Sequence, residues 1–305
     1  MNIGGALAEW LRSGLQNRVH QFNSGRRLHL IMNILYCGDN GISRGVLVSI
    51  LSLLMRGKKE NIYHIFIATI KYKNVVPFSK KTADFLDNLV KKYNKNSFVK
   101  LIDATEVFTK NLPKKNMNSY FTPCSMLRLY ADKMPELKDL TKILYLDYDV
   151  VARKDIEELY EINIDDYEAA GALDIYGKNF YYYHGLKQDY MNSGVMLFNL
   201  KKCRENKVFE RAVLKCVSKK MMLADQAALN KVIEKRKILP RKYNEQSDRP
   251  KSDTVLHHFS NNFKFFPFFH VQKVKPFEIK KIHRILKITE YDDILDEYER
   301  LSDQL

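Results

Sequence analysis

The sequence contains few cysteines and no long apolar run. Its four cysteines form no C-x-x-C pair and lie far apart, which predicts neither a zinc site nor a disulfide framework. A reducing, cytoplasmic setting fits that usage. No stretch of 18 apolar residues occurs, so we expect no transmembrane helix. The chain also lacks an internal repeat and a Gly/Ser/Pro-rich linker, which favours one main domain.

Acidic residues are also fewer than basic ones. The chain has 36 acidic residues against 51 Lys and Arg, and its formal net charge is +15. Such an excess favours an anionic partner, such as nucleic acid, anionic lipid or a phosphate-bearing substrate. The alternative is that most lysines simply cover solvated faces. No nucleic-acid recognition motif accompanies the charge, so we expect no nucleic-acid partner.

The two ends of the chain differ from its middle. Residues 1–31 hold Trp10, the sole tryptophan, and lack the apolar region of a signal peptide. Met32 then opens a strand-like run, so we expect residues 1–31 to be an extension or a misassigned start. Residues 32–270 are the expected catalytic domain, and residues 271–305 a basic and helical C-terminal appendage.

Short apolar runs alternate with helical patterns after residue 32, which predicts an α/β domain with a mainly parallel sheet. Ligands of such sheets bind beyond the carboxyl ends of the strands. The predicted strands are Ile34–Cys37, Tyr63–Ala68, Phe98–Ile102, Ile143–Leu146, Ala169–Leu173 and Val195–Asn199. The predicted helices are Arg44–Arg56, Lys80–Tyr93, Ser125–Ala131, Ile156–Tyr160, Glu205–Lys219, Asp225–Lys235 and Tyr291–Leu301.

Two carboxylates follow the fourth of these strands, in "ILYLDYDVV". Residues i and i+2 of an extended chain point to the same side, so Asp147 and Asp149 can face one point in space. Two converging carboxylates favour a hard divalent cation. A chain with 20 Asp contains about one Asp-x-Asp pair by chance, however. The pair indicates a metal site only because an apolar strand comes directly before it.

Two enzyme classes use an apolar strand followed by Asp-x-Asp. Metal-dependent glycosyltransferases hold a nucleotide-sugar there, and haloacid-dehalogenase-type phosphatases have a similar motif. The phosphatase motif sits early in its domain and needs a later G-D-x-x-x-D segment, which this chain lacks. A non-catalytic nucleotide-sugar binding module is a third interpretation.

Further segments resemble glycosyltransferase family 8, the retaining galactosyl- and glucosyltransferases with lipopolysaccharide galactosyltransferases among them. "MNILYCGDNGI" is similar to the family's first strand, and "SMLRLYADKMPELKDLTKILYLDYDVV" to its Arg-bearing helix and Asp-x-Asp core. "YMNSGVMLFNL", "LADQAALN" and "LHHFSNNFKFF" resemble three later motifs. The resemblance implies a GT-A fold, a Rossmann-like nucleotide-binding mixed sheet flanked by helices.

The resemblance also implies a ligand set. Asp147, Asp149 and His258 match the family's metal ligands, with Asp147 also near the donor ribose and sugar. An imidazole beside two carboxylates suits Mn²⁺ better than Mg²⁺, which is the alternative. The register of the motif selects His258 over the adjacent His257.

The remaining donor contacts come from the same matches. The resemblance implies a UDP-sugar donor, with Asp39 bonded to the uracil and Lys264 bonded to the diphosphate. Asp39 can also serve as a helix cap, and the two roles are compatible. The other expected donor-binding residues are Cys37, Gly38, Arg128, Asp174 and Asn192.

Asp225 and Gln226 match the pair at the reacting face of the sugar. A covalent retaining mechanism needs a carboxylate nucleophile, whereas the family has a Gln amide at this point. We therefore expect substitution on the same face, with the Gln226 carbonyl stabilising the oxocarbenium-like centre. Asp225 is the second nucleophile candidate.

The C-terminal part departs from the family pattern and carries a basic segment. Asn261 replaces the usual Gly of the last motif, and Asn is the next best residue for a positive φ. Residues 271–287 combine six cations with isoleucines at helical spacing. This segment is expected either to contact an anionic membrane, at the inner face of the plasma membrane, or to dock on the core. Glycan, lipid-linked and protein acceptors all remain open.

Overall fold

The computed structural model describes residues 30–117, 122–177, 189–264, 266 and 268–305. Residues 31–305 form one compact unit. The expectation for the N-terminal extension lies outside the described residues, except that the first strand begins at Ile31, one residue before Met32. Among the described residues, no helix is both long and apolar enough to cross a bilayer.

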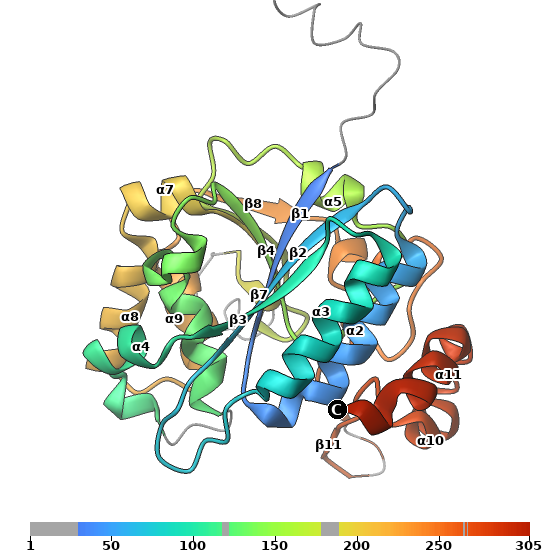
Figure 1. The fold of residues 1–305 in the computed structure, drawn as a ribbon. Coiled ribbons are helices and arrows are strands. Elements are labelled where there is room, and N and C mark those ends of the chain that lie inside the picture. The colour runs from blue at the N-terminus through green and yellow to red at the C-terminus, as the bar shows by residue number, and fades with distance from the viewer. Residues whose placement is uncertain (1–29, 118–121, 178–188, 265, 267) are drawn as a thin grey trace, which may run out of the picture. The chain divides into compact units, whose positions relative to one another are not determined.

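A seven-stranded mixed sheet forms the centre of this unit, in the order β3-β2-β1-β4-β7-β6-β8 (Figure 1). Every strand runs parallel to its neighbours except β7, which pairs antiparallel with both β4 and β6. The strands are β1 (Ile31–Cys37), β2 (Ile62–Thr69), β3 (Phe98–Asp103), β4 (Lys142–Leu146), β6 (Ala169–Leu173), β7 (Met191–Asn199) and β8 (Arg236–Leu239).

Helices cover both faces of the sheet, as Figure 1 shows with α2 and α3 on one side and α4, α8 and α9 on the other. The central strands are therefore apolar nearly throughout, because neither face meets water. In β1, the Tyr36 hydroxyl pairs with Ser49 of α2, whereas Leu35 belongs to the core beneath α8 and α9. The α-helices are α2 (Ser43–Arg56), α3 (Lys80–Tyr93), α4 (Thr105–Lys110), α5 (Glu157–Glu161), α7 (Leu200–Glu205), α8 (Val208–Ser218), α9 (Ala224–Val232), α10 (Ile279–Lys281) and α11 (Asp292–Leu301).

Shorter elements complete the fold. Two small antiparallel sheets pair β5 (Val150–Ala152) with β9 (Leu256–His258), and β10 (Asn262–Lys264) with β11 (His270–Gln272). The 3₁₀ helices are η1 (Asn40–Ile42), η2 (Lys114–Asn116), η3 (Pro123–Lys133), η4 (Pro135–Leu137), η5 (Arg241–Tyr243) and η7 (Ser302–Gln304), and η6 (Ile282–Leu286) is a π-helical turn.

Several sequence predictions need correction. The helix expected at Asp225–Lys235 ends at Val232, and β8 begins at Arg236. The segment expected as helix Ser125–Ala131 is the 3₁₀ helix η3. Asn261 does not take a positive φ: among the described residues, the non-glycine residues that do are Lys73, Lys207 and Lys287.

The C-terminal residues pack on the rest of the unit. Helix α11 lies against α2, where both guanidinium nitrogens of Arg56 donate to the Asp293 carboxylate at 2.7 Å. Within the basic segment, Ile282 and Leu286 are buried and Ile285 is exposed. Most of the apolar stripe of residues 271–287 is thus docked on the core.

Candidate active site

The ends of three neighbouring strands meet at one edge of the sheet. Strand β4 ends just before Asp147, and β6 ends just before Asp174. Because β7 runs antiparallel, its beginning, not its end, lies at this edge, with Met191 opposite Leu173. The Asp147 N–H donates to the Gly194 carbonyl at 2.8 Å, which ties the Asp-x-Asp turn to β7. The site therefore lies at the carboxyl ends of the parallel strands, as α/β sheets predict.

Asp147, Asp149 and His258 form a cluster whose ligand atoms all lie within 4.8 Å of one another. His258 Nε2 is 3.3 Å from Asp149 Oδ1 and 3.8 Å from Asp147 Oδ2. His258 is the last residue of β9, and the pairing of β9 with β5 places it opposite Val150, one residue after Asp149. Two carboxylates and an imidazole are a donor set that suits Mn²⁺.

Gly194 keeps the space behind this cluster open. A Cβ at that position would lie 2.2 Å from His258 Cε1, 2.7 Å from His258 Nδ1 and 2.9 Å from Asp147 Oδ2. Any other residue would push two of the three ligand groups. The residues present therefore fit a bound divalent cation.

A chain of amides orients the histidine. His258 Nδ1 donates to Asn244 Oδ1 at 3.1 Å, which leaves the Nε2 lone pair facing the carboxylates. Asn244 Nδ2 donates in turn to Asn192 Oδ1 at 2.9 Å. Asn244 escaped the sequence analysis, because it follows the short helix η5 with no local pattern around it.

The neighbouring His257 serves the core instead. Its Nε2 donates to the Ser247 carbonyl at 3.0 Å, and its Nδ1 lies 3.2 Å from the Tyr291 hydroxyl. Burial lowers the pKa of His257 to about 4, so the ring is neutral. The structure thus brings His258, and not His257, to the acidic pair.

Arg128 is buried behind the acidic pair. Its Nη2 donates to Asp147 Oδ1 at 2.8 Å, its Nη1 donates to the Ser193 carbonyl at 2.7 Å, and its Nε lies 3.2 Å from Asp225 Oδ2. The guanidinium also stacks over the Tyr145 ring at 3.9 Å. All of these are contacts to the protein itself, so Arg128 balances the buried Asp225 and the half-buried Asp147.

Asp149 has a cationic partner that sequence reasoning assigned elsewhere. Lys275 Nζ lies 2.5 Å from Asp149 Oδ2. Burial alone would raise the pKa of the Asp149 carboxyl, but Lys275 and His258 outweigh it and hold that pKa well below its usual range. Lys275 belongs to the basic segment 271–287, which was considered for membrane contact.

A second polar network lies at the end of β6. Asp174 Oδ2 accepts from Asn192 Nδ2 at 2.9 Å and from Gln226 Nε2 at 3.2 Å. Gln226 Oε1 accepts from the Ser193 N–H at 2.9 Å. The Gln226 amide is therefore fixed in orientation, with its carbonyl held at the start of β7.

Asp225 is nearly inaccessible to solvent. Burial raises the pKa of its carboxyl, although Arg128 acts in the opposite direction. A buried carboxylate already held by a guanidinium is a poorer nucleophile than a free one, because the ion pair stabilises its charge. The ion pair with Arg128 thus weakens Asp225 as a candidate nucleophile.

The end of β1 lies beside this edge. Burial raises the pKa of the Cys37 thiol, so the thiol stays protonated, and the Gly38 N–H donates to the Ala68 carbonyl at 3.0 Å. Asp39 Oδ1 accepts from the Gly41 N–H at 2.9 Å, which makes Asp39 the N-cap of η1. The capping role that the sequence allowed is therefore present.

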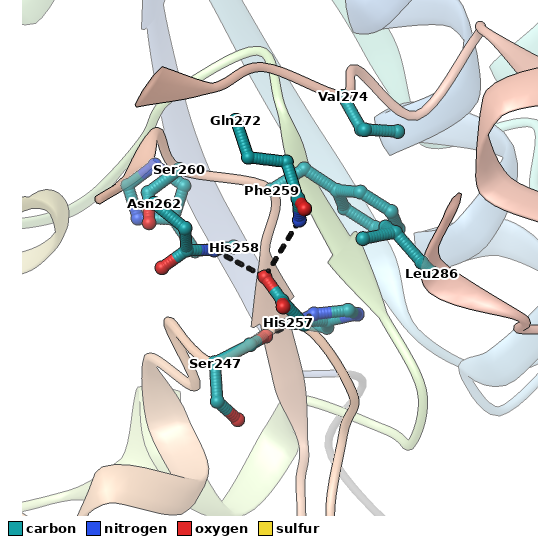
Figure 2. A pocket seen from close by; sticks show the side chains of 10 residues that line it. Ser247, His257, His258, Phe259, Ser260, Asn262, Gln272, Val274 and Leu286 are labelled. Atoms are coloured by element: carbon teal, nitrogen blue, oxygen red, sulfur yellow. Dashed lines mark hydrogen bonds between the residues drawn. The ribbon is translucent and has the colours of Figure 1, made fainter. Parts of the chain in front are cut away.

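Lys264 lies in the β10–β11 hairpin, where it pairs with Asp248. Figure 2 shows Asn262 and Gln272 from the two strands of that hairpin converging on the same acidic side chain, and Asp248 Oδ1 accepts from each at 2.9 Å. A groove of about 590 Å³ runs along this side, and its walls include Tyr176, Lys264 and Ile285. The cavity drawn in Figure 2, about 10 Å³, has room for one water at most.

Comparison with known proteins identifies the family. The sequence profile of "Glycosyl transferase family 8" matches residues 33–276. The chain belongs to glycosyl transferase family 8. This membership argues against the phosphatase interpretation and confirms the family that the motifs predicted.

Curated relatives carry glycosyltransferase names. The chain is 28% identical over 223 residues to a lipopolysaccharide 1,2-glucosyltransferase of Escherichia coli, which covers 70% of this chain and 62% of the relative. It is 27% identical over 227 residues to the lipopolysaccharide 1,3-galactosyltransferase of Salmonella typhimurium, and this alignment covers 70% of this chain and 63% of the relative. The match thus spans about three fifths of the length of these relatives.

Solved structures support the GT-A fold. The galactosyltransferase LgtC, in complex with donor and acceptor sugar analogs, superposes with a TM-score of 0.63 at 16% identity, covering 90% of this chain and all of LgtC. The glycosyltransferase GlyE of Streptococcus pneumoniae superposes with a TM-score of 0.56 at 18% identity, and the match covers 89% of this chain and 64% of GlyE. The predicted fold class is confirmed.

Proposed function

We propose that this chain is a metal-dependent, retaining hexosyltransferase that moves glucose or galactose from a UDP-sugar to a glycan, glycolipid or glycoprotein acceptor. The observation that carries the proposal is the cluster of Asp147, Asp149 and His258 at the strand ends of a family 8 chain. Mn²⁺ is the proposed ion, with Mg²⁺ as the alternative. When bound, the ion would neutralise the donor diphosphate and the charge that builds up on it as the sugar leaves.

The proposed donor lies across the ends of β1 and β4, where the order of strands reverses. Asp39 would accept from the uracil, with Cys37 and Gly38 lining the same edge. Arg128 acts on the donor through Asp147, because its guanidinium is already bonded to that carboxylate and to Ser193.

Lys264 is the proposed cation for the diphosphate. Its present partner is Asp248, so binding of the donor would exchange one anionic partner for another. A lysine that meets the growing charge on the departing diphosphate stabilises the transition state more than the ground state.

The proposed reaction retains configuration by substitution on one face of the sugar. The bond from the anomeric carbon to the diphosphate oxygen breaks, and the bond to the acceptor oxygen forms on the same face. The proton of the acceptor hydroxyl passes to the leaving diphosphate. In this scheme the Gln226 carbonyl would stabilise the positive anomeric centre, Asn192 would contact the sugar, and Asp174, to which both side chains donate, would lie near the donor sugar or the acceptor.

Membrane contact through residues 271–287 belongs to the same proposal, with the enzyme working at the cytoplasmic face of the plasma membrane. Lys280, Lys281, Arg284 and Lys287 are exposed, and exposed cations attract anionic headgroups. Co-sedimentation with vesicles of phosphatidylglycerol and phosphatidylcholine tests this contact. Equal binding to vesicles of phosphatidylcholine alone would contradict it.

The decisive experiment is a donor screen. UDP release from UDP-glucose, UDP-galactose and UDP-N-acetylglucosamine is followed with Mn²⁺, with Mg²⁺ and with EDTA, and Asp147→Asn serves as the inactive control. We expect release from one of the first two donors, abolished by EDTA. Donor binding without any release would instead identify a non-catalytic binding module.

A further inference from the structure

Lys275 reaches the candidate metal site from a distant part of the chain. It follows strand β11 and lies 126 residues after its partner Asp149. Its Nζ is 2.5 Å from Asp149 Oδ2 and 3.3 Å from the Phe259 carbonyl, and it lies 5.6 Å from the centre of the Tyr148 ring. The contact joins the C-terminal segment to the Asp-x-Asp turn.

The backbone around Lys275 fixes its position. Val274 is buried at 3% exposure, and the Lys275 N–H donates to Glu278 Oε2 at 2.8 Å. The Lys275 side chain is 21% exposed, and the Asp149 side chain 7%. The fold thus positions the Lys275–Asp149 contact, and the contact is largely buried, so its charge interaction is screened less than one at the surface.

The two carboxylates of the Asp-x-Asp turn have different cationic partners. Asp147 pairs with Arg128 at 2.8 Å, and Asp149 pairs with Lys275 at 2.5 Å. Arg128 is also shared with Asp225 at 3.2 Å, whereas Asp149 and Lys275 form a closer pair. Asp149 therefore does not need a metal ion to balance its charge, and an arriving divalent cation meets Lys275 as a like charge.

A nucleoside diphosphate reverses that balance. A divalent cation alone brings two positive charges beside the Asp149–Lys275 pair, which is itself balanced. The cation and the diphosphate of a nucleotide-sugar together bring almost no net charge. An ammonium group beside the ion disfavours the first state and favours the second. Binding of the two ligands must then be coupled, and by linkage the coupling is reciprocal.

We propose that Lys275 is a positioning residue that makes divalent cation binding depend on the nucleoside diphosphate: it holds Asp149 in a charge-balanced state and opposes the cation when the diphosphate is absent. This inference rests on the proposed function of the same site. It assigns to Lys275 a role beside that of Lys264, which pairs with Asp248 in the hairpin.

The test measures cation binding and needs no turnover. Isothermal titration calorimetry gives the dissociation constant of Mn²⁺ for the full chain, with and without saturating UDP. The variants are Lys275→Met, which removes the charge, and Lys275→Gln, which keeps a neutral donor near Asp149 if the methionine variant folds poorly. Lys280→Met is the matched control, because Lys280 belongs to the same segment and is exposed.

In the wild type we expect UDP to strengthen Mn²⁺ binding. Because removal of a like charge lowers the electrostatic energy of the bound ion, either Lys275 variant should bind Mn²⁺ alone about tenfold more tightly, and the strengthening by UDP should fall by a similar factor. Lys280→Met should leave both quantities unchanged. A purely structural lysine would give a different result, because its loss would loosen Asp149 and weaken Mn²⁺ binding.

The outcomes separate the two proposals. If the wild type binds no Mn²⁺ with or without UDP, the proposed function fails. If it binds Mn²⁺ but the Lys275 variants match it, or bind the ion more weakly, the proposed function stands and the role of Lys275 is wrong. Failure of both variants to fold, judged by circular dichroism, would likewise make Lys275 a structural residue and overturn the inference.

Discussion

Replacing Gly194 by alanine is the sharpest perturbation that the candidate site offers. The added methyl group would lie 2.2 Å from His258 Cε1 and 2.9 Å from Asp147 Oδ2. Carbon atoms in contact lie about 3.5 Å apart, so the His258 ring must withdraw by about 1 Å. Neither ligand can yield cheaply, since Asn244 holds the ring and the Asp147 N–H is bonded to the Gly194 carbonyl.

A shift of that size exceeds what a metal site tolerates. Ligand distances must stay within about 0.2 Å of their ideal values. We therefore expect Gly194→Ala to weaken Mn²⁺ binding, measured with UDP present, by about 10–100-fold. The strain should also lower the free energy of unfolding by about 1–3 kcal/mol, as overpacking of a core does.

Gly171→Ala is the matched control for this prediction. Gly171 lies in β6, the strand next to β7, and its added methyl would meet nothing closer than Met191 Sδ at 3.3 Å. Calorimetry with Mn²⁺ and UDP, together with urea unfolding, compares the two variants. Wild-type Mn²⁺ affinity in Gly194→Ala would refute the reasoning, because the three side chains could not then be ligands in the observed arrangement.

Four further substitutions test separate parts of the site. Asn244→Ala removes the acceptor that orients His258, and Mn²⁺ affinity with UDP should fall about tenfold; Asn206→Ala, whose amide contacts Glu168 instead, should have no effect. Gln226→Ala should lower kcat with little change in the donor dissociation constant, and a large rise in that constant would contradict its role at the reacting sugar. Asp248→Asn frees Lys264, so UDP should bind about two- to fivefold more tightly in the presence of Mn²⁺; weaker binding would mean that Asp248 supports the bound state. Arg128→Met leaves the buried Asp225 without its cation and takes the same cation from the half-buried Asp147, so it should cost about 3–5 kcal/mol in urea unfolding; loss of the exposed Arg300 should cost under about 0.5 kcal/mol.

The six longest strands could be predicted because both faces of the sheet are covered. A strand such as β4 is then apolar from Ile143 to Leu146 and ends where the polar residues of the Asp-x-Asp turn begin. Strand β8 escaped detection because it begins with Arg236 and Lys237, which continue the helical pattern of the residues before it. Its place at the edge of the sheet, next to β6, explains how it tolerates them.

Local motifs predicted the cluster of expected metal ligands, since Asp147, Asp149 and His258 do come together. The residues that orient those ligands carry no local signal. Asn244 lies in an irregular stretch, and Asp248 acts only by contact with the β10–β11 hairpin. Hydrogen-bond partners far apart in sequence depend on tertiary packing, which a single sequence does not display.

The two lysines near the site show this limit most directly. Lys264 stands in a family motif and pairs with Asp248, whereas Lys275 stands in no motif and pairs with Asp149. In a chain with 51 Lys and Arg, composition cannot distinguish one such residue from another. Their contacts can, because a lysine on a ligand carboxylate changes cation binding and a lysine in the hairpin does not. Removing each charge in turn should therefore separate the two lysines by the affinity for Mn²⁺ alone: Lys275→Met should strengthen it, whereas Lys264→Met should leave it unchanged and weaken the binding of UDP with Mn²⁺.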